Sequence, residues 1–318
     1  MPRALYFLKK CLLFFTIFFV FCYSFQGCCA KTSSLKFAQI SDAHFTTIEE
    51  DTSYKVLKSS PHLLDDAITQ VNNIPNIDFI IYTGDLINTP NQNELLKFIN
   101  HAKLSIKPWY STFGNHDVCV SGGLNKGKFL EIMCGHNENF CYKNSYYSFT
   151  PKKGYKVIVL DTTIDEQNCS NGKITKEQLD WLKKELNKSK GDITLIYTHV
   201  PVIEPFPSEN HRLLNSYDLK LLLKKYSNPI IVCSGHYHAS KIVQEDNILY
   251  IASPSLVTYP CAFRIVNILP KRNKVIVDVY IKETRLKTIQ DCAKAKCMAS
   301  PLLCGKEEDR NWSYEIKK

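Results

Sequence analysis

Several features that assign a protein to a class are missing from this chain of 318 residues. It has no internal repeat and no low-complexity linker, so repeat arrays and long flexible tethers are not expected. Its lysines and arginines are spread out rather than clustered, which argues against a nucleic-acid polymer as partner despite the formal net charge of +9. Its cysteines do not have the spacing of a structural zinc site. The apolar fraction of 44% is ample for a core, and the mild positive charge suits small anionic substrates.

The first 27 residues contain no acidic residue. A basic start precedes an apolar run at Cys11–Phe25, and small residues follow at Gly27–Ala30, which is the layout of a secretory signal. The apolar run is shorter than the roughly 20 residues needed to cross a bilayer. We therefore expect residues 1–30 to direct export to the periplasm, the cell envelope or the outside. Two alternatives attach the N-terminus to a membrane: an uncleaved anchor, or lipidation at Cys28, because Phe25-Gln26-Gly27-Cys28 resembles a lipoprotein box.

The chain contains 13 cysteines, which is many for a cytosolic protein of this length, and export would permit disulfides. Two groups are expected to be bridged, with undetermined connectivity: Cys119, Cys134 and Cys141, and then Cys292, Cys297 and Cys304. Cys233 lies inside an apolar strand pattern, and we expect it to be a buried free thiol.

Short apolar runs alternate with amphipathic patterns along most of the chain, which predicts an α/β fold. Helices are expected around residues 63–71, 90–99, 128–133, 175–186 and 215–226. Strands are expected at Leu35–Ser41, Asp78–Thr83, Trp109–Phe113, Tyr146–Thr150, Lys156–Leu160, Ile193–Tyr197, Ile230–Cys233, Ile248–Ala252, Phe263–Ile268 and Val275–Ile281.

Two segments depart from this alternation. The segment Val118–Ser145 contains four glycines and three cysteines, and a long irregular segment between regular elements is usually functional. We expect it to contact the substrate and to decide substrate choice. After Arg285 the chain is rich in lysine and shows no clear periodicity. The expected organisation is therefore one domain over residues 31–285 and a Cys- and Lys-containing tail over residues 286–318.

Polar side chains follow five of the predicted strands, each where the strand ends. In chain order the fragments are Asp42-x-His44, Gly84-Asp85, Gly114-Asn115-His116-Asp117, His199 and Gly235-His236-x-His238. Each fragment alone is an ordinary turn or loop. The two histidines of the last fragment point the same way if the backbone is extended there, which makes this fragment the most indicative of metal binding. Together the fragments predict one site at the strand ends.

The residue types suit hydrolysis of a phosphate ester. Two metal ions about 3.5–4 Å apart can neutralise the phosphoryl oxygens and activate a bridging water or hydroxide. Asp85, which follows a tight glycine turn, is the natural bridging carboxylate. Imidazole, carboxylate and one amide oxygen suit Mn, Fe or Zn better than Mg or Ca, and the identity of the metal stays open.

This series of fragments resembles the signature of the calcineurin-like metallophosphoesterases, which is D-x-H, G-D, G-N-H-D/E, H and G-H-x-H. The resemblance covers about residues 36–281, and every motif position is filled. It implies a four-layer α-β-β-α sandwich of two mixed β-sheets flanked by helices, with a dinuclear metal site at the strand ends.

The same resemblance implies a role for each motif residue. One metal ion would be held by Asp42, His44, Asp85 and His238. The other would be held by Asp85, Asn115, His199 and His236. His116 would be catalytic, either stabilising the phosphoryl oxygens or protonating the leaving group, and Asp117 would be the carboxylate that orients it.

The sequence lacks the signatures of two branches of the family, the protein Ser/Thr phosphatases and the purple acid phosphatases. Leu86-Ile87-Asn88 replaces the longer signature of protein Ser/Thr phosphatases, and Asn88 stands where purple acid phosphatases carry a metal-bound tyrosine. The stretches Tyr147-Ser148-Phe149 and Val159-Leu160-Asp161-Thr162 look more like the class III cyclic-nucleotide phosphodiesterases. Some of these positions serve packing, so they indicate ancestry better than substrate.

We therefore expect an exported metal-dependent phosphoesterase that acts on a small phosphate ester, with a phosphodiester such as a cyclic nucleotide favoured. A phosphomonoesterase of the acid phosphatase type is the main alternative. A sphingomyelinase-like lipid phosphodiesterase is less favoured because no saposin-like region is evident. A non-catalytic binding protein of this fold typically loses motif residues, and here none is lost.

Overall fold

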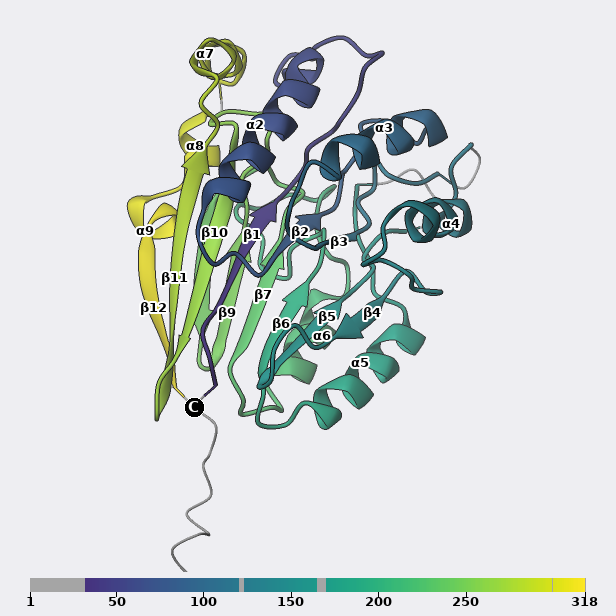
Figure 1. Cartoon of the computed structure of the whole chain (residues 1–318). Coiled ribbons are helices and arrows are strands. Elements are labelled where there is room, and N and C mark those ends of the chain that lie inside the picture. The colour runs from purple at the N-terminus through teal and green to yellow at the C-terminus, as the bar shows by residue number, and fades with distance from the viewer. Residues whose placement is uncertain (1–31, 120–122, 165–169, 299, 318) are drawn as a thin grey trace, which may run out of the picture. The chain divides into compact units, whose positions relative to one another are not determined.

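Two six-stranded β-sheets form the centre of the structure, a computed structural model that describes residues 32–119, 123–164, 170–298 and 300–317 (Figure 1). Each sheet contains both parallel and antiparallel pairs, and helices flank them. The predicted sandwich of two mixed sheets is therefore confirmed. The expected export signal lies outside the described residues. Within the described ranges, no helix is both long and apolar enough to cross a membrane.

The first sheet has the order β12-β11-β10-β1-β2-β3, and the second has the order β4-β5-β6-β7-β9-β8. The first contains β1 (Leu35–Ile40), β2 (Phe79–Thr83), β3 (Trp109–Thr112), β10 (Ala262–Pro270), β11 (Lys274–Glu283) and β12 (Trp312–Lys317). The second contains β4 (Tyr147–Phe149), β5 (Tyr155–Val159), β6 (Ile193–Tyr197), β7 (Ile230–Ser234), β8 (Lys241–Glu245) and β9 (Ile248–Ala252). All the predicted strands are present with nearly the predicted bounds, but β8 and β12 were not predicted.

The helices are α2 (Ser60–Asn73), α3 (Gln92–Ala102), α4 (Lys126–His136), α5 (Lys176–Lys188), α6 (Ser216–Leu223), α7 (Lys287–Lys296), α8 (Ser300–Cys304) and α9 (Glu307–Arg310), with a 3-10 turn η1 (Leu57–Ser59) before α2. The first five agree with the predicted helical segments. Thr175 caps the N-terminus of α5, because its side chain accepts a hydrogen bond from the Gln178 amide. The Gln178 side chain does not complete a capping box and instead bonds both backbone groups of Asp161.

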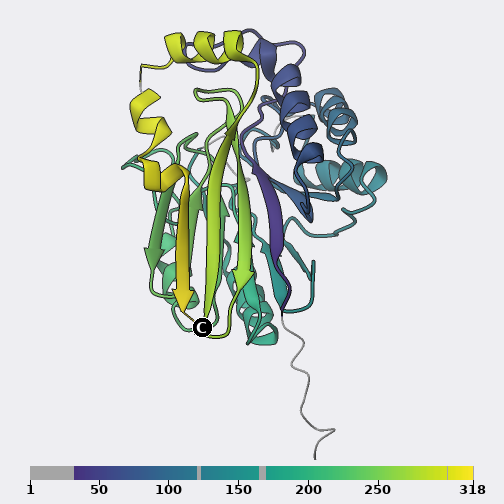
Figure 2. The ribbon, with the colours of Figure 1, turned by 60° about the vertical axis from the view of Figure 1, so that its left-hand side comes forward.

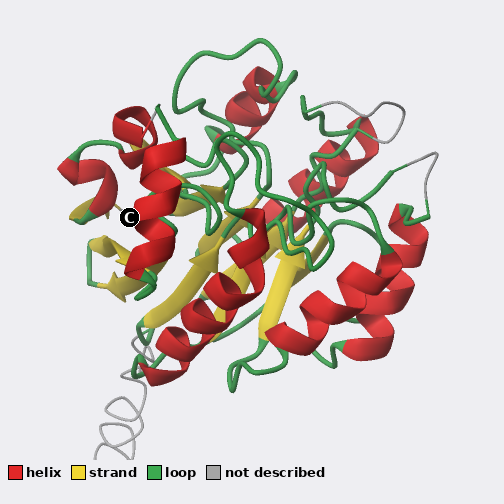
Figure 3. Cartoon of the chain, turned by 90° about the horizontal axis from the view of Figure 1, so that it is seen from above, coloured by secondary structure: helices red, strands yellow, loops and turns green. Residues whose placement is uncertain are grey.

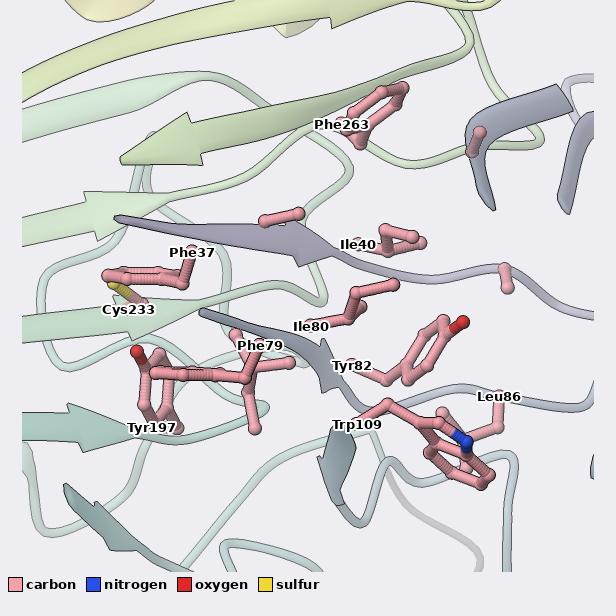
Figure 4. Close-up of a cluster of buried hydrophobic side chains, with 14 of the residues drawn as sticks. Phe37, Ile40, Phe79, Ile80, Tyr82, Leu86, Trp109, Tyr197, Cys233 and Phe263 are labelled. Carbon is pink, nitrogen blue, oxygen red and sulfur yellow. The ribbon is translucent and has the colours of Figure 1, made fainter. Parts of the chain in front are cut away.

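Successive side chains of a strand point alternately to its two faces. One face packs in the apolar layer between the two sheets, and the other packs in the apolar layer under the helices. Between the sheets, the rings of Phe37 and Phe79 are stacked with centroids 5.4 Å apart, and Tyr197 of the other sheet meets Phe37 edge-on at 5.6 Å (Figure 4). The alternate residues Ile158 and Ile196 point the other way and pack with α5 and α6. The strands are thus buried on both faces, as their continuous apolar runs predict.

The C-terminal tail belongs to the same compact unit as the sheets, which begins at Ser33. β12 pairs antiparallel with β11, and Figure 2 shows it in yellow along the edge of the sheet. The Asp309 carboxylate accepts a hydrogen bond from the Ile242 amide at 2.9 Å, and its carbonyl accepts one from the buried Arg264 guanidinium at 2.8 Å. The expectation of a tail without periodicity was wrong. The alternating signal of β12 is present in Trp312, Tyr314 and Ile316.

The cysteines follow the prediction only in part. Cys134 and Cys141 form a disulfide within the irregular segment, as expected for that group. Cys292 and Cys304 are thiols, so the expected bridging of these two tail residues is contradicted. Cys233 is a buried thiol between the sheets, as predicted (Figure 4).

Candidate metal centre

The five polar fragments meet at one end of the sandwich. β1, β2 and β3 are parallel neighbours in the first sheet, and β6 and β7 are parallel neighbours in the second, so the loops after them leave at the same edge of each sheet. Figure 3 looks onto this end, where loops gather above the strands. The structure therefore brings together residues that lie up to about two hundred positions apart in the sequence.

The first group of predicted ligands is fully buried and closely spaced. The Nε2 atoms of His44 and His238 lie 3.1 Å apart. His44 Nε2 is 3.5 Å from an Asp85 carboxylate oxygen, and His238 Nε2 is 3.5 Å from an oxygen of Asp42. All four potential ligand atoms lie within 4.8 Å of one another. Two imidazole nitrogens and two carboxylates that converge in this way fit a divalent cation.

The second group shares Asp85 with the first. The same Asp85 oxygen is 3.4 Å from His199 Nε2, which is 3.0 Å from His236 Nδ1. The Asn115 side-chain oxygen is 3.1 Å from His199 Nε2 and completes the predicted set. His199 Nδ1 lies 2.8 Å from the Thr83 carbonyl, which fixes this ring with Nε2 facing the site. The two groups, joined through Asp85, are consistent with a dimetal centre.

Burial sets the protonation of most of these histidines. Burial first, and then the charge of Lys55, lowers the pKa of His44 well below its ordinary value. Burial likewise lowers the pKa of His236 and His238. These rings are therefore neutral near pH 7, which is the form that binds metals. Burial alone would also lower the pKa of His199, but the Asp85 charge outweighs it and raises the pKa to about 9.

Five of the site residues have a left-handed backbone with positive φ: Asp42, His44, Asp85, His236 and His238. Such a conformation costs a non-glycine residue about 1 kcal/mol or more and is typical of functional sites. The expectation of an extended backbone at the paired histidines was therefore wrong. Left-handed turns, rather than a continued strand, bring both rings to the site.

At two motif glycines, any side chain would overlap neighbouring atoms of the site. A Cβ atom at Gly114 would overlap the Asp85 carboxylate, and a Cβ atom at Gly235 would overlap Ser41 Oγ and press on the Asp42 carboxylate. The Asp42 carboxylate also accepts hydrogen bonds from the His236 amide at 3.0 and 3.1 Å. The glycines therefore let the ligand loops approach each other.

His116 lies at the edge of the centre, and a backbone carbonyl contacts its ring. Its ring centroid is 4.6 Å from that of His44. Its Nδ1 lies 2.6 Å from the Asn88 carbonyl, so the backbone of Asn88 orients the ring. The Asp117 carboxylate instead accepts hydrogen bonds from the amides of Gly114 at 2.7 Å and Ile87 at 3.1 Å. The Asp117 side chain thus turns back onto its own loop, and its role in orienting His116 stays a prediction.

Lys55 also reaches the site, which the sequence did not indicate. Its side chain is buried, and its Nζ lies 3.4 Å from His44 Nδ1. Burial lowers its pKa, although the nearby charges of Asp85 and Asp42 oppose this effect. No motif surrounds Lys55 in the sequence, so no sequence signal indicated that it reaches the site.

Comparison with a model of the calcineurin-like phosphoesterases gives a match over residues 35–240, about two thirds of the chain. This range contains all five fragments. The chain belongs to the calcineurin-like phosphoesterase family. It is therefore a metallophosphoesterase, a hydrolase of phosphate esters, as predicted.

Several known proteins are similar to this family member. A probable glycerophosphodiester phosphodiesterase of Arcobacter nitrofigilis is 28% identical, over 68% of this chain and 77% of its own length. A 3′,5′-cyclic adenosine monophosphate phosphodiesterase of Haemophilus influenzae is 25% identical, over 71% of this chain and 78% of its own length. A solved dimetal phosphatase from Danio rerio superimposes with a TM-score of 0.62 at 15% identity and covers 79% of this chain and 99% of its own. This structural likeness concerns the fold.

Proposed function

We propose that this metallophosphoesterase hydrolyses small phosphodiesters, with a cyclic nucleotide as the favoured substrate. The observation that carries the proposal is the complete donor set, with Asp85 between two buried groups of ligands and His116 beside them. The phosphodiesterase names of the similar proteins support a diester over a monoester.

The donor set also supports roles for individual residues. The first ion would be held by Asp42, His44, Asp85 and His238, and the second by Asp85, Asn115, His199 and His236. When bound, two such ions supply positive charge for the phosphoryl oxygens and activate water as nucleophile. Neutral imidazoles and one amide favour Mn, Fe or Zn.

His116 is proposed to supply the proton of the reaction. Its Nδ1 donates to the Asn88 carbonyl, so Nε2 is the atom that exchanges a proton with the substrate. As the bond from phosphorus to the leaving oxygen breaks and a bond from phosphorus to water forms, protonated Nε2 gives its proton to the leaving oxygen. Lys55 contacts His44 Nδ1, on the other side of the ring from the Nε2 atom that faces the centre, so we propose that it orients this ligand.

The test uses the full-length chain, purified and loaded with Mn²⁺. We expect turnover of bis(p-nitrophenyl) phosphate and of 3′,5′-cyclic AMP, with slower turnover of p-nitrophenyl phosphate. Faster turnover of the monoester would favour the alternative of an acid phosphatase-like monoesterase. Turnover of none of the three with Mn, Fe or Zn would contradict the proposal.

We also propose that the protein is exported, as the layout of residues 1–30 indicates. Fractionation of cells that express the full chain tests this. Recovery with the periplasm, the medium or the envelope is expected, and recovery with cytosolic markers alone would contradict it.

A further inference from the structure

A cavity of about 490 Å³ opens beside the metal centre. Two of the proposed ligands, His236 and His238, form part of its wall. Tyr237 of the same loop also lines it, and three other segments contribute, among them Tyr54, Phe206 and the tail residues Lys296–Met298 and Leu303. A volume in this range suits a small organic ligand. The cavity therefore lies where a group attached to a bound phosphate would extend.

The C-terminal tail forms one wall of this cavity. Its residues Lys296–Met298 and Leu303 line the cavity and lie outside the range matched by the family model. The Leu303 carbonyl accepts a hydrogen bond from the Ser240 amide at 2.8 Å, two residues after His238. Leu303 also packs in a buried apolar cluster with Tyr237, between the two ligands in sequence. The wall is thus fixed directly to the loop that carries His236 and His238.

Lys296 connects the tail to a second wall of the cavity, the loop that carries Tyr54. Lys296 Nζ lies 3.6 Å from an Asp51 carboxylate oxygen and 3.4 Å from the Thr52 carbonyl. This contact connects the tail to the loop that presents Tyr54. The centroid of the Tyr54 ring lies 6.3 Å from that of His238, so Tyr54 lies close to the metal centre.

The chemistry of the lining favours a flat, uncharged group. Phe206 and Tyr237 meet edge to face with centroids 5.1 Å apart, and Tyr54 adds a third ring. Among the residues that the structure describes, no acidic one lines the cavity, and Met298 and Leu303 add apolar surface. Aromatic rings bind heterocycles by stacking, and this interaction tolerates different bases. An acyl chain or a small alcohol would make no use of the ring faces.

Resting on the proposed function, we propose that Tyr54, Phe206 and the tail residues Lys296–Met298 and Leu303 form a subsite that holds the nucleobase of a phosphodiester substrate. Substrate choice would then depend on the tail rather than on Val118–Ser145, because no described residue of that segment lines this cavity. The tail residues are specificity residues, and they take no part in the chemical step.

The test compares two substrates that differ only in the base. The first is 3′,5′-cyclic AMP, and the second is the same cyclic ribose phosphate with a 1-O-methyl group in place of adenine. The full-length, Mn-loaded enzyme should show a kcat/KM ratio of about 5 or more in favour of the base, since stacking of a base on aromatic side chains contributes about 1–3 kcal/mol. A ratio near one, with both substrates hydrolysed, would overturn the subsite and leave the proposed function intact.

Substitutions of single residues show which side chains produce this preference for the base. Tyr54→Ala and Phe206→Ala should each lower the ratio about fivefold or more, because each removes a ring for stacking. Leu303→Ala should also lower it, because it removes apolar surface from the cavity wall. Tyr217→Ala and Leu302→Ala change an exposed tyrosine and an exposed leucine that do not line the cavity, and they should leave the ratio unchanged. Metal content is measured alongside. If Leu303→Ala loses metal and slows both substrates equally, the tail only positions the ligand loop and its proposed role in specificity is wrong.

Discussion

Adding one methyl group at Gly235 should damage the metal centre more than most larger changes elsewhere. The Cβ atom of alanine would overlap Ser41 Oγ and lie 2.5 Å from an Asp42 carboxylate oxygen. Both neighbours are buried, so neither can swing into solvent. To make room, Asp42 must give up its hydrogen bonds with the His236 amide.

The loss of stability has two contributions, the steric overlap of the new Cβ atom and the lost hydrogen bonds of Asp42. Overpacking a buried site costs about 1–3 kcal/mol. A hydrogen bond to a charged group contributes about 1.5–3 kcal/mol. We expect Gly235→Ala to lower the free energy of unfolding by about 3–5 kcal/mol, the sum of these ranges with some relaxation. The first metal site, which contains Asp42, should lose affinity more than the second.

Gly135→Ala is the matched control. It lies in α4, and nothing approaches its Cβ position within 4 Å, so alanine there should stabilise the protein by about 0.5–1 kcal/mol. Urea unfolding gives both free energies, and metal analysis after Mn²⁺ loading gives the occupancy. A Gly235→Ala protein with wild-type stability and full metal content would refute the reasoning.

His116→Ala should lower kcat for bis(p-nitrophenyl) phosphate by about 10²–10⁴-fold with both ions retained; His62→Ala, on the exposed face of α2, is the control. Acid should destabilise the fold through Glu185. Burial alone would raise its pKa, but hydrogen bonds from Lys156, Lys188 and Ser148 outweigh this and lower the pKa to about 2. The stabilisation is complete above its unfolded pKa of 4.5 and is lost as pH falls toward 2, so Glu185→Gln should flatten the stability curve in that window. Reduction of the Cys134–Cys141 disulfide should cost about 2.5 kcal/mol, a small value for a disulfide because it closes a short loop; a Cys134→Ser, Cys141→Ser double variant should match the reduced protein in urea.

The sequence predicted the sheets and the meeting of the polar fragments at one place because both depend on local patterns. Continuous apolar runs such as Phe79–Thr83 are typical of strands buried on both faces, and the structure contains them. The polar fragments follow these strands directly. Parallel neighbours must then place the fragments at one end, so Asp85 and His199 meet although 114 positions separate them.

What the sequence did not reveal depends on contacts between distant segments. Asp117 bonds to the Gly114 and Ile87 amides, and only the folded loop places these donors near it. Lys55 reaches His44 without any local pattern. Leu303 reaches the ligand loop because β12 and α9 fix the tail to the sheets. The alternation in β12 was readable, but the packing of the tail against the site was not.

The number of metal ions bound by the wild-type chain and by Asp85→Asn tests the central claim most directly. Asp85 is the one carboxylate shared by both ligand groups. We predict two Mn²⁺ ions per wild-type chain, and the loss of both together in Asp85→Asn, measured by metal analysis after dialysis against Mn²⁺. One ion or none in the wild type, or a variant that keeps two ions with unchanged affinity, would contradict a dinuclear centre built around Asp85.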